Sequence, residues 1–224
     1  MRISYRRKFI FISRPRCAST FIRSILTPYS DILSSATPPY HHHATALELE
    51  KHFIETERNW NDFFSFTTIR NPYNMMVSYY EFFKPDINGI YRYEESRDKI
   101  KYNPDDLIGF NKWIETGKTY HRYAIRKGKV IINLWVKGFS KLTLNNAIIG
   151  KSGESIVNKI IKVEDFEHSL SDVLKSLDIP MPKTLPDLNR SERQKDYRYY
   201  YNSFSKKIIE DEFAYDIELG KYKF

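Results

Sequence analysis

The first residues that could do chemistry lie in the segment Arg14-Pro-Arg-Cys-Ala-Ser-Thr-Phe21, which joins an apolar run to a segment with helical spacing. The free N–H groups and the dipole of a helix N-terminus favour an anion. Arg16 adds a positive charge there, and the hydroxyls of Ser19 and Thr20 add two hydrogen-bond donors. The segment lacks the glycines and the lysine of a nucleoside triphosphatase loop. It predicts a site for a phosphate-like group, although a capped helix with surface arginines would use the same residues.

Cys17 and Arg23 also match the C-x5-R pattern of cysteine-dependent phosphatases. In those enzymes the five intervening residues, usually with glycines, form a loop around the anion. Here Phe21 and Ile22 occupy core positions of a helix that has already begun, and no glycine eases a turn. A phosphatase is therefore only the lesser alternative, and Cys17 is expected to be a small packing residue.

A second candidate anion site follows the apolar run 64–69. Arg70 stands directly after this run, and Ser78 follows eight residues later on an expected helix. Eight helical residues span about two turns. Both side chains can therefore face one anion only if the chain bends at Asn71-Pro72, which a proline permits.

Three consecutive histidines provide candidates for a general base, because the pKa of histidine lies near neutral pH. His43 is the first choice because it directly precedes an expected helix start, and His41 and His42 are its competitors. Glu48 and Glu164 are carboxylate alternatives. Adjacent side chains of an extended chain point in opposite directions, so the histidine run does not favour a metal site.

The elements that must position these residues follow from the apolar pattern. Short runs rich in β-branched and aromatic residues predict buried strands at 8–13, 64–69 and 156–163. Helical spacing predicts helices at about 19–26, capped by Ser19 or Thr20, and at 44–53, 75–83, 106–115, 166–177 and 197–213, and for much of 120–140. The polar stretch 84–105 is expected to be a surface excursion. Alternating strands and helices predict a single α/β domain over 1–224, with a mainly parallel sheet and a ligand site beyond the carboxyl ends of its strands.

Composition excludes several classes of protein. The 224 residues carry a net charge of +8, 41% are hydrophobic, and one is cysteine. Such a chain is too apolar to be disordered and cannot form an internal disulfide. Neither zinc-ligand spacing nor an apolar run of the roughly 18 residues that span a bilayer occurs. We expect a cytoplasmic protein without a membrane span, and the positive charge favours an anionic partner.

A nucleic-acid-binding module is the alternative from another class. Residues 190–201 mix arginines and a lysine with tyrosines, as proteins that bind single strands do. Acidic residues at 210–212 of the same expected helix oppose this interpretation, and a tyrosine-rich stripe usually packs. No nucleic acid partner is therefore expected.

The two candidate anion sites, in this order, resemble sulfotransferases that use 3′-phosphoadenosine-5′-phosphosulfate (PAPS), especially the carbohydrate and bacterial branch. The family's first loop, P-[KR]-x-[AG]-[GS]-T, is similar to Pro15-Arg-Cys-Ala-Ser-Thr20, and its R-N-P-Y-x-x-x-V-S pattern is similar to 70–78. Weaker similarity occurs at His43-Ala-Thr-Ala46, 161–166, 188–191 and Tyr215-Asp216.

The resemblance implies a three-layer P-loop-like domain, in which helices flank a central, mainly parallel sheet. It also implies transfer of the sulfuryl group of PAPS, without a metal, to a hydroxyl of an acceptor. The polarity of 84–105 and of the loops near 118–129 and 180–196 favours a sugar or glycan as that acceptor.

The same resemblance assigns roles to individual residues. The 5′-phosphosulfate would be held by the first loop, namely Arg16, Cys17, Ala18, Ser19, Thr20 and Phe21. Arg70 and Ser78 would bind the 3′-phosphate. Arg16 would also stabilise charge on the leaving phosphate, and His43 would be the catalytic base.

Overall fold

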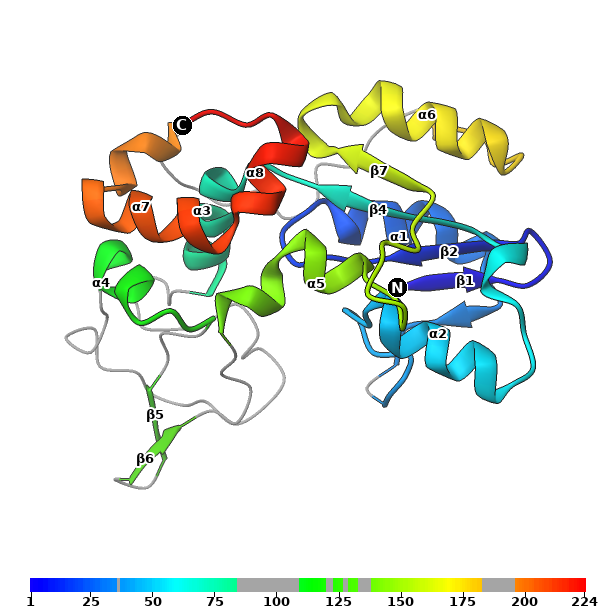
Figure 1. The fold of residues 1–224 in the computed structure, drawn as a ribbon, viewed down its shortest axis with the longest axis horizontal. Coiled ribbons are helices and arrows are strands. Elements are labelled where there is room, and N and C mark those ends of the chain that lie inside the picture. The colour runs from blue at the N-terminus through cyan, green and yellow to red at the C-terminus, as the bar shows by residue number, and fades with distance from the viewer. Residues whose placement is uncertain (36, 84–108, 120–122, 127–128, 133–137, 183–195) are drawn as a thin grey trace. The chain divides into compact units, whose positions relative to one another are not determined.

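The structure is a computed structural model, shown as a ribbon in Figure 1. It describes residues 1–35, 37–83, 109–119, 123–126, 129–132, 138–182 and 196–224. The chain divides into two compact units. The first contains Met1–Asn71, Leu142–Arg190 and Tyr215–Tyr222, and the second contains Pro72–Lys141, Ser191–Ala214 and Lys223–Phe224. A single domain over 1–224 stays a prediction.

A sheet of five strands forms the centre of the first unit. Its strands are β1 (Arg2–Ser4), β2 (Phe9–Ile12), β3 (Ile32–Leu33), β4 (Phe64–Ile69) and β7 (Lys159–Lys162), in the order β3-β1-β2-β4-β7. Strands β2, β4 and β7 are parallel, whereas β1 runs antiparallel to both of its neighbours. The mainly parallel sheet is confirmed, and the carboxyl ends of its three parallel strands meet at one edge (Figure 1).

Helices cover both faces of this sheet. They are α1 (Ser19–Leu26), α2 (Ala46–Glu55), α5 (Leu144–Ile148) and α6 (Phe166–Ser176). Successive side chains of a strand point to opposite faces. Phe11 of β2 accordingly packs with α1 and α6, whereas its neighbour Ile12 packs with α2 and α5. The predicted arrangement of three layers is therefore confirmed.

The second unit is built around an aromatic core. Its elements are α3 (Pro72–Phe83), α4 (Phe110–Glu115), β5 (Tyr123–Arg126), β6 (Lys129–Ile132), a 3₁₀ segment η6 (Tyr197–Tyr200) and α7 (Ser203–Glu212). Phe110 lies edge-on to Tyr80, Trp113 and Tyr201, with ring centroids 4.8–5.8 Å apart. Further 3₁₀ segments of the described chain are η1 (Thr27–Tyr29), η2 (Trp60–Asp62), η4 (Phe139–Leu142) and η5 (Val163–Asp165).

Two helix predictions are wrong. The described part of 120–140 contains the antiparallel pair β5 and β6, since the β-branched run 130–132 favours a strand. The helix expected over 197–213 is interrupted at Asn202, whose side chain accepts a hydrogen bond from the Ser205 amide (2.8 Å) and so begins α7. A further helix, α8 (Ala214–Gly220), follows α7. The predicted surface excursion at 84–105 lies outside the described residues.

Candidate anion-binding site

The predicted anion loop lies between β2 and α1, at the carboxyl ends of the parallel strands. Arg16 and Ala18 both adopt left-handed backbone conformations, with φ of 56° and 57°. For residues other than glycine, such a conformation costs on the order of 1–3 kcal/mol and persists only where the surroundings enforce it. The question is therefore which groups hold the loop.

Three carbonyl groups of the loop are held by polar side chains. Ser19 Oγ donates to the Arg14 carbonyl (2.5 Å), Arg70 Nη1 to the Arg16 carbonyl (2.8 Å) and Thr68 Oγ1 to the Cys17 carbonyl (2.7 Å). In a planar trans peptide the C=O and N–H groups point in opposite directions. The Arg16 and Cys17 carbonyls are therefore followed by amides, those of Cys17 and Ala18, that point away from the side chains holding the carbonyls and can bind an anion. Pro15, which follows the Arg14 carbonyl, has no N–H.

The N-terminus of α1 adds further amides next to the loop. Its N-cap residue is Ala18, which provides no side-chain cap. The predicted cap is wrong, because Ser19 is already helical and its hydroxyl donates to the Arg14 carbonyl instead. The amides of the first turn, which include those of Ser19, Thr20 and Phe21, have no intrahelical acceptor and suit an anion. Thr20 is exposed there, whereas Phe21 is buried.

One buried hydroxyl at the start of the loop is consistent with a ligand. Ser13 is 2% exposed, and its Oγ has no hydrogen-bond partner among the described residues. Buried polar atoms normally have a partner. An anion with several oxygen acceptors can supply one, so the residues present fit a phosphate or phosphosulfate group.

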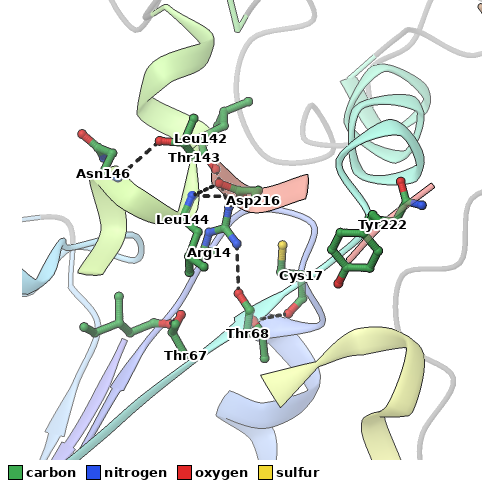
Figure 2. A network of polar contacts seen from close by, with 12 residues as sticks. Arg14, Cys17, Thr67, Thr68, Leu142, Thr143, Leu144, Asn146, Asp216 and Tyr222 are labelled. Atoms are coloured by element: carbon green, nitrogen blue, oxygen red, sulfur yellow. Dashed lines mark hydrogen bonds and ion pairs between the residues drawn. The ribbon is translucent and has the colours of Figure 1, made fainter. Parts of the chain in front are cut away.

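The buried side chain of Arg14 anchors the loop to the core, a role that was not predicted from the sequence. Its guanidinium donates to the Thr68 carbonyl (3.1 Å) and to the Leu142 carbonyl (2.8 Å), and it forms an ion pair with Asp216 of α8 (2.7 Å) (Figure 2). The Asp216 carboxylate also accepts from the Leu144 amide, the first of α5. Arg14 and Asp216 are 1% and 0% exposed. The only signal for Asp216 in the sequence was its place in a family motif, and an arginine before a proline is typical of a surface loop.

The cysteine phosphatase alternative does not fit this geometry. Cys17 is fully buried, and burial raises the pKa of its thiol, which is therefore protonated at neutral pH. Arg23 lies in the last turn of α1, not at the end of a loop. Its guanidinium donates to Nδ1 of His42 (2.5 Å). The sequence match at Cys17 and Arg23 is therefore a coincidence of spacing.

Arg70, the second predicted anion ligand, reaches the first loop. Its side chain is half-buried, and its guanidinium donates to the Arg16 carbonyl at 2.8 Å. The next amide, of Asn71, donates to Glu164 (2.7 Å). Ser78 lies on α3 in the second unit and is buried, and its part in binding stays a prediction. The structure thus brings Arg70 and the first loop together within one unit.

His43 also lies near the carboxyl end of β2, where it contacts Ser13. Its Nδ1 lies 3.0 Å from the Ser13 carbonyl, which can only accept, so Nδ1 carries the proton and Nε2 holds the free electron pair. His43 is an exposed residue, yet the protein around its imidazole desolvates the ring and lowers the pKa of His43 to about 4. The positive charges of the amino terminus and Arg23 add to this effect. His43 is therefore neutral at pH 7 and able to accept a proton.

The competing bases have other partners. Glu48 forms a capping box with Thr45 at the start of α2 and contacts His41 (3.2 Å). His42 Nδ1 accepts from Arg23, and Glu164 accepts from the Tyr222 hydroxyl (2.8 Å) in addition to Asn71. Each of these groups has a structural contact that proton transfer would disturb.

Among the described residues, no three histidine, cysteine, aspartate or glutamate side chains are placed to hold a metal ion. The helices of that part of the chain are too short or too polar to cross a lipid bilayer.

A family model described as "Sulfotransferase family" matches residues 1–222. No curated protein sequence matches the chain. Among solved structures, the chain is similar to mouse sulfotransferase SULT7A1 complexed with PAP, with 11% identity over 98% of this chain and 88% of that chain and a TM-score of 0.49.

Proposed function

Because the chain belongs to the sulfotransferase family, we propose that it transfers the sulfuryl group of PAPS to a hydroxyl group of a carbohydrate acceptor. The enzyme class and its co-substrate follow from the family. The identity of the acceptor and the roles of individual residues are our proposals.

One observation carries the assignment of the donor site. Arg70 lies after β4, 54 positions along the chain from Arg16, yet its guanidinium is 2.8 Å from the Arg16 carbonyl. Two groups that suit anions, the loop amides and the Arg70 guanidinium, therefore lie side by side at the carboxyl ends of β2 and β4. A nucleotide with phosphates on its 5′ and 3′ positions presents two anionic groups of that kind, and guanidinium binds phosphate strongly.

The loop residues bind the phosphosulfate and stabilise the negative charge that develops on it. In sulfuryl transfer the acceptor oxygen forms a bond to sulfur while the bond from sulfur to the phosphate oxygen breaks, so negative charge grows on the leaving bisphosphate. By analogy with phosphoryl transfer, positioning and charge stabilisation dominate. The amides at the start of α1 and the Arg16 guanidinium supply both, and Arg16 is not a proton donor because it stays charged.

His43 removes the proton of the acceptor hydroxyl. The Ser13 carbonyl fixes the proton on Nδ1, which leaves Nε2 as the base. A low pKa keeps the imidazole neutral before the reaction, and the negative charge of the bound donor raises that pKa toward the range in which proton transfer is efficient.

The polar composition of 84–105 supports a sugar or glycan acceptor. The test is a screen with ³⁵S-labelled PAPS against mono- and oligosaccharides, phenols and a steroid alcohol. We expect label to enter a saccharide and incorporation to be lost in Arg70→Ala. The matched control is Arg58→Ala. Arg58 precedes the amino end of β4, whereas Arg70 follows its carboxyl end, and the Arg58 guanidinium carbon lies 4.6 Å from the centroid of the Tyr5 ring. Labelling of the phenol or steroid alone would refute the carbohydrate acceptor.

The nucleic-acid alternative has little structural support. Tyr197 stacks on Tyr73 at 6.3 Å, and the Tyr201 hydroxyl donates to the Tyr73 carbonyl, so these tyrosines pack on α3. Arg198 is paired with Asp196 (3.2 Å). Arg190, Arg193 and Lys195 lie outside the described residues. If the protein binds short single-stranded oligonucleotides, and adenosine 3′,5′-bisphosphate (PAP) does not displace them, this alternative is favoured.

A further inference from the structure

We propose that the buried ion pair of Arg14 and Asp216 is a positioning pair of the donor site, which holds the loop 14–18 in its binding shape and so sets the affinity for the 5′ end of PAPS. This inference rests on the proposed function.

The side chain of Arg14 joins three separate segments to the base of the loop. It donates to the Thr68 carbonyl in β4 (3.1 Å), to the Leu142 carbonyl (2.8 Å) and to the Asp216 carboxylate (2.7 Å). Its own carbonyl accepts from Ser19 Oγ (2.5 Å), at the start of α1. Arg14 therefore connects the two ends of the loop to the sheet and to α8 (Figure 2).

Thr68 transmits this anchoring directly to the loop. Its carbonyl accepts from the Arg14 guanidinium, while its hydroxyl donates to the Cys17 carbonyl at 2.7 Å. The neighbouring Thr67 Oγ1 donates to the Ile12 carbonyl at the end of β2 (2.7 Å). A displacement of the Arg14 side chain would therefore reach the loop through Thr68, between the two left-handed residues at 16 and 18.

Asp216 supplies the charge that keeps Arg14 in place. It is fully buried, and its carboxylate accepts from the Leu144 amide at 2.9 Å as well as from Arg14. Removing one partner of a buried pair leaves the other charge without compensation. Apolar residues of the same volume could stabilise this part of the core equally well. The charged pair is therefore better explained by a role in holding the loop 14–18 in one conformation.

The experiment measures affinity for adenosine 3′,5′-bisphosphate (PAP) and adenosine 5′-monophosphate by calorimetry, below the unfolding transition of each variant. Asp216→Asn keeps an acceptor for the Leu144 amide but removes the charge. The double variant Arg14→Met/Asp216→Asn removes both charges and should unfold at a higher temperature than Asp216→Asn alone. The control is Asp178→Asn, which breaks an exposed ion pair with Arg7 (3.4 Å) in the same unit.

We expect Asp216→Asn and the double variant to bind both nucleotides between about tenfold and about a hundredfold more weakly, because displacement of the loop groups weakens binding on that order. The factor should be the same for each nucleotide, since both carry the 5′ phosphate that the loop binds. Asp178→Asn should bind as the wild type does. If the double variant keeps wild-type affinity for both nucleotides, the pair only stabilises the fold and the proposal is wrong. A wild-type protein that does not bind PAP would overturn the proposed function, and this inference with it.

Discussion

At His43, one hydrogen bond decides which nitrogen is available for chemistry. The Ser13 carbonyl accepts from Nδ1 at 3.0 Å, so Nε2 is left as the base. Asparagine can keep this hydrogen bond through its amide but cannot take a proton. We expect His43→Asn to lower kcat by about 10²–10⁴-fold with unchanged affinity for PAP. Turnover of labelled PAPS and calorimetry with PAP measure the two quantities, and undiminished turnover would exclude His43 as the base.

The pKa of His43 also predicts how stability depends on pH. Because the folded protein lowers the pKa of His43 to about 4 from an ordinary value of 6.5, the unfolded chain binds a proton first as the pH falls. The contribution of His43 to stability is therefore complete above pH 6.5 and is lost between pH 6.5 and about 4. Urea unfolding from pH 7 to 4 should show a smaller loss of stability in His43→Asn than in the wild type, and equal losses would contradict the lowered pKa.

Between β2 and α1, the chain makes a sharp turn without glycine. Ala18 has φ of 57°, where a Cβ costs roughly 1–2 kcal/mol and glycine costs nothing. We expect Ala18→Gly to raise the free energy of unfolding by about 0.5–1 kcal/mol, after the greater entropy of glycine in the unfolded chain is subtracted. Urea unfolding measures this difference.

The control for Ala18 is an alanine with ordinary helical conformation. Ala46, the first residue of α2, meets that condition, and Ala46→Gly should lower the free energy of unfolding by about 0.5–1 kcal/mol. A decrease of the same size in Ala18→Gly would show that residue 18 is not left-handed in solution.

Strands β2, β4 and β7 and helices α1, α2 and α6 of the first unit were predictable because each has a local apolar pattern, whereas β1, β3, α5 and α8 were not predicted. The run Phe64–Ile69 is apolar and β-branched, and it forms β4 with these bounds. The loop 14–18 was recognised by its charge and hydroxyls next to a helix start. What could not be predicted locally was the cap of α1, because Ser19 donates to a carbonyl five residues earlier instead of capping the helix.

Contacts between distant parts of the chain explain what the sequence did not reveal. Asp216 pairs with Arg14, 202 positions earlier, and Tyr222 contacts Glu164, so the segment Tyr215–Tyr222 returns to the strand ends of the first unit. No local pattern links such residues, since an arginine before a proline and an aspartate in a helix are both common on surfaces. The predicted fold class is confirmed and the anion loop stays a prediction, whereas the buried support of the loop required the three-dimensional structure.

In the proposed function, the first loop and Arg70 bind opposite ends of one nucleotide. Calorimetry with PAP and adenosine 5′-monophosphate, on the wild type and Arg70→Ala, tests it most directly. The wild type should prefer PAP by at least about tenfold, or about 1.4 kcal/mol, and Arg70→Ala should lose this preference. Its affinity for the monophosphate should fall less than its affinity for PAP, because Arg70 also holds the Arg16 carbonyl of the loop. A preference for PAP that survives in Arg70→Ala would contradict the account.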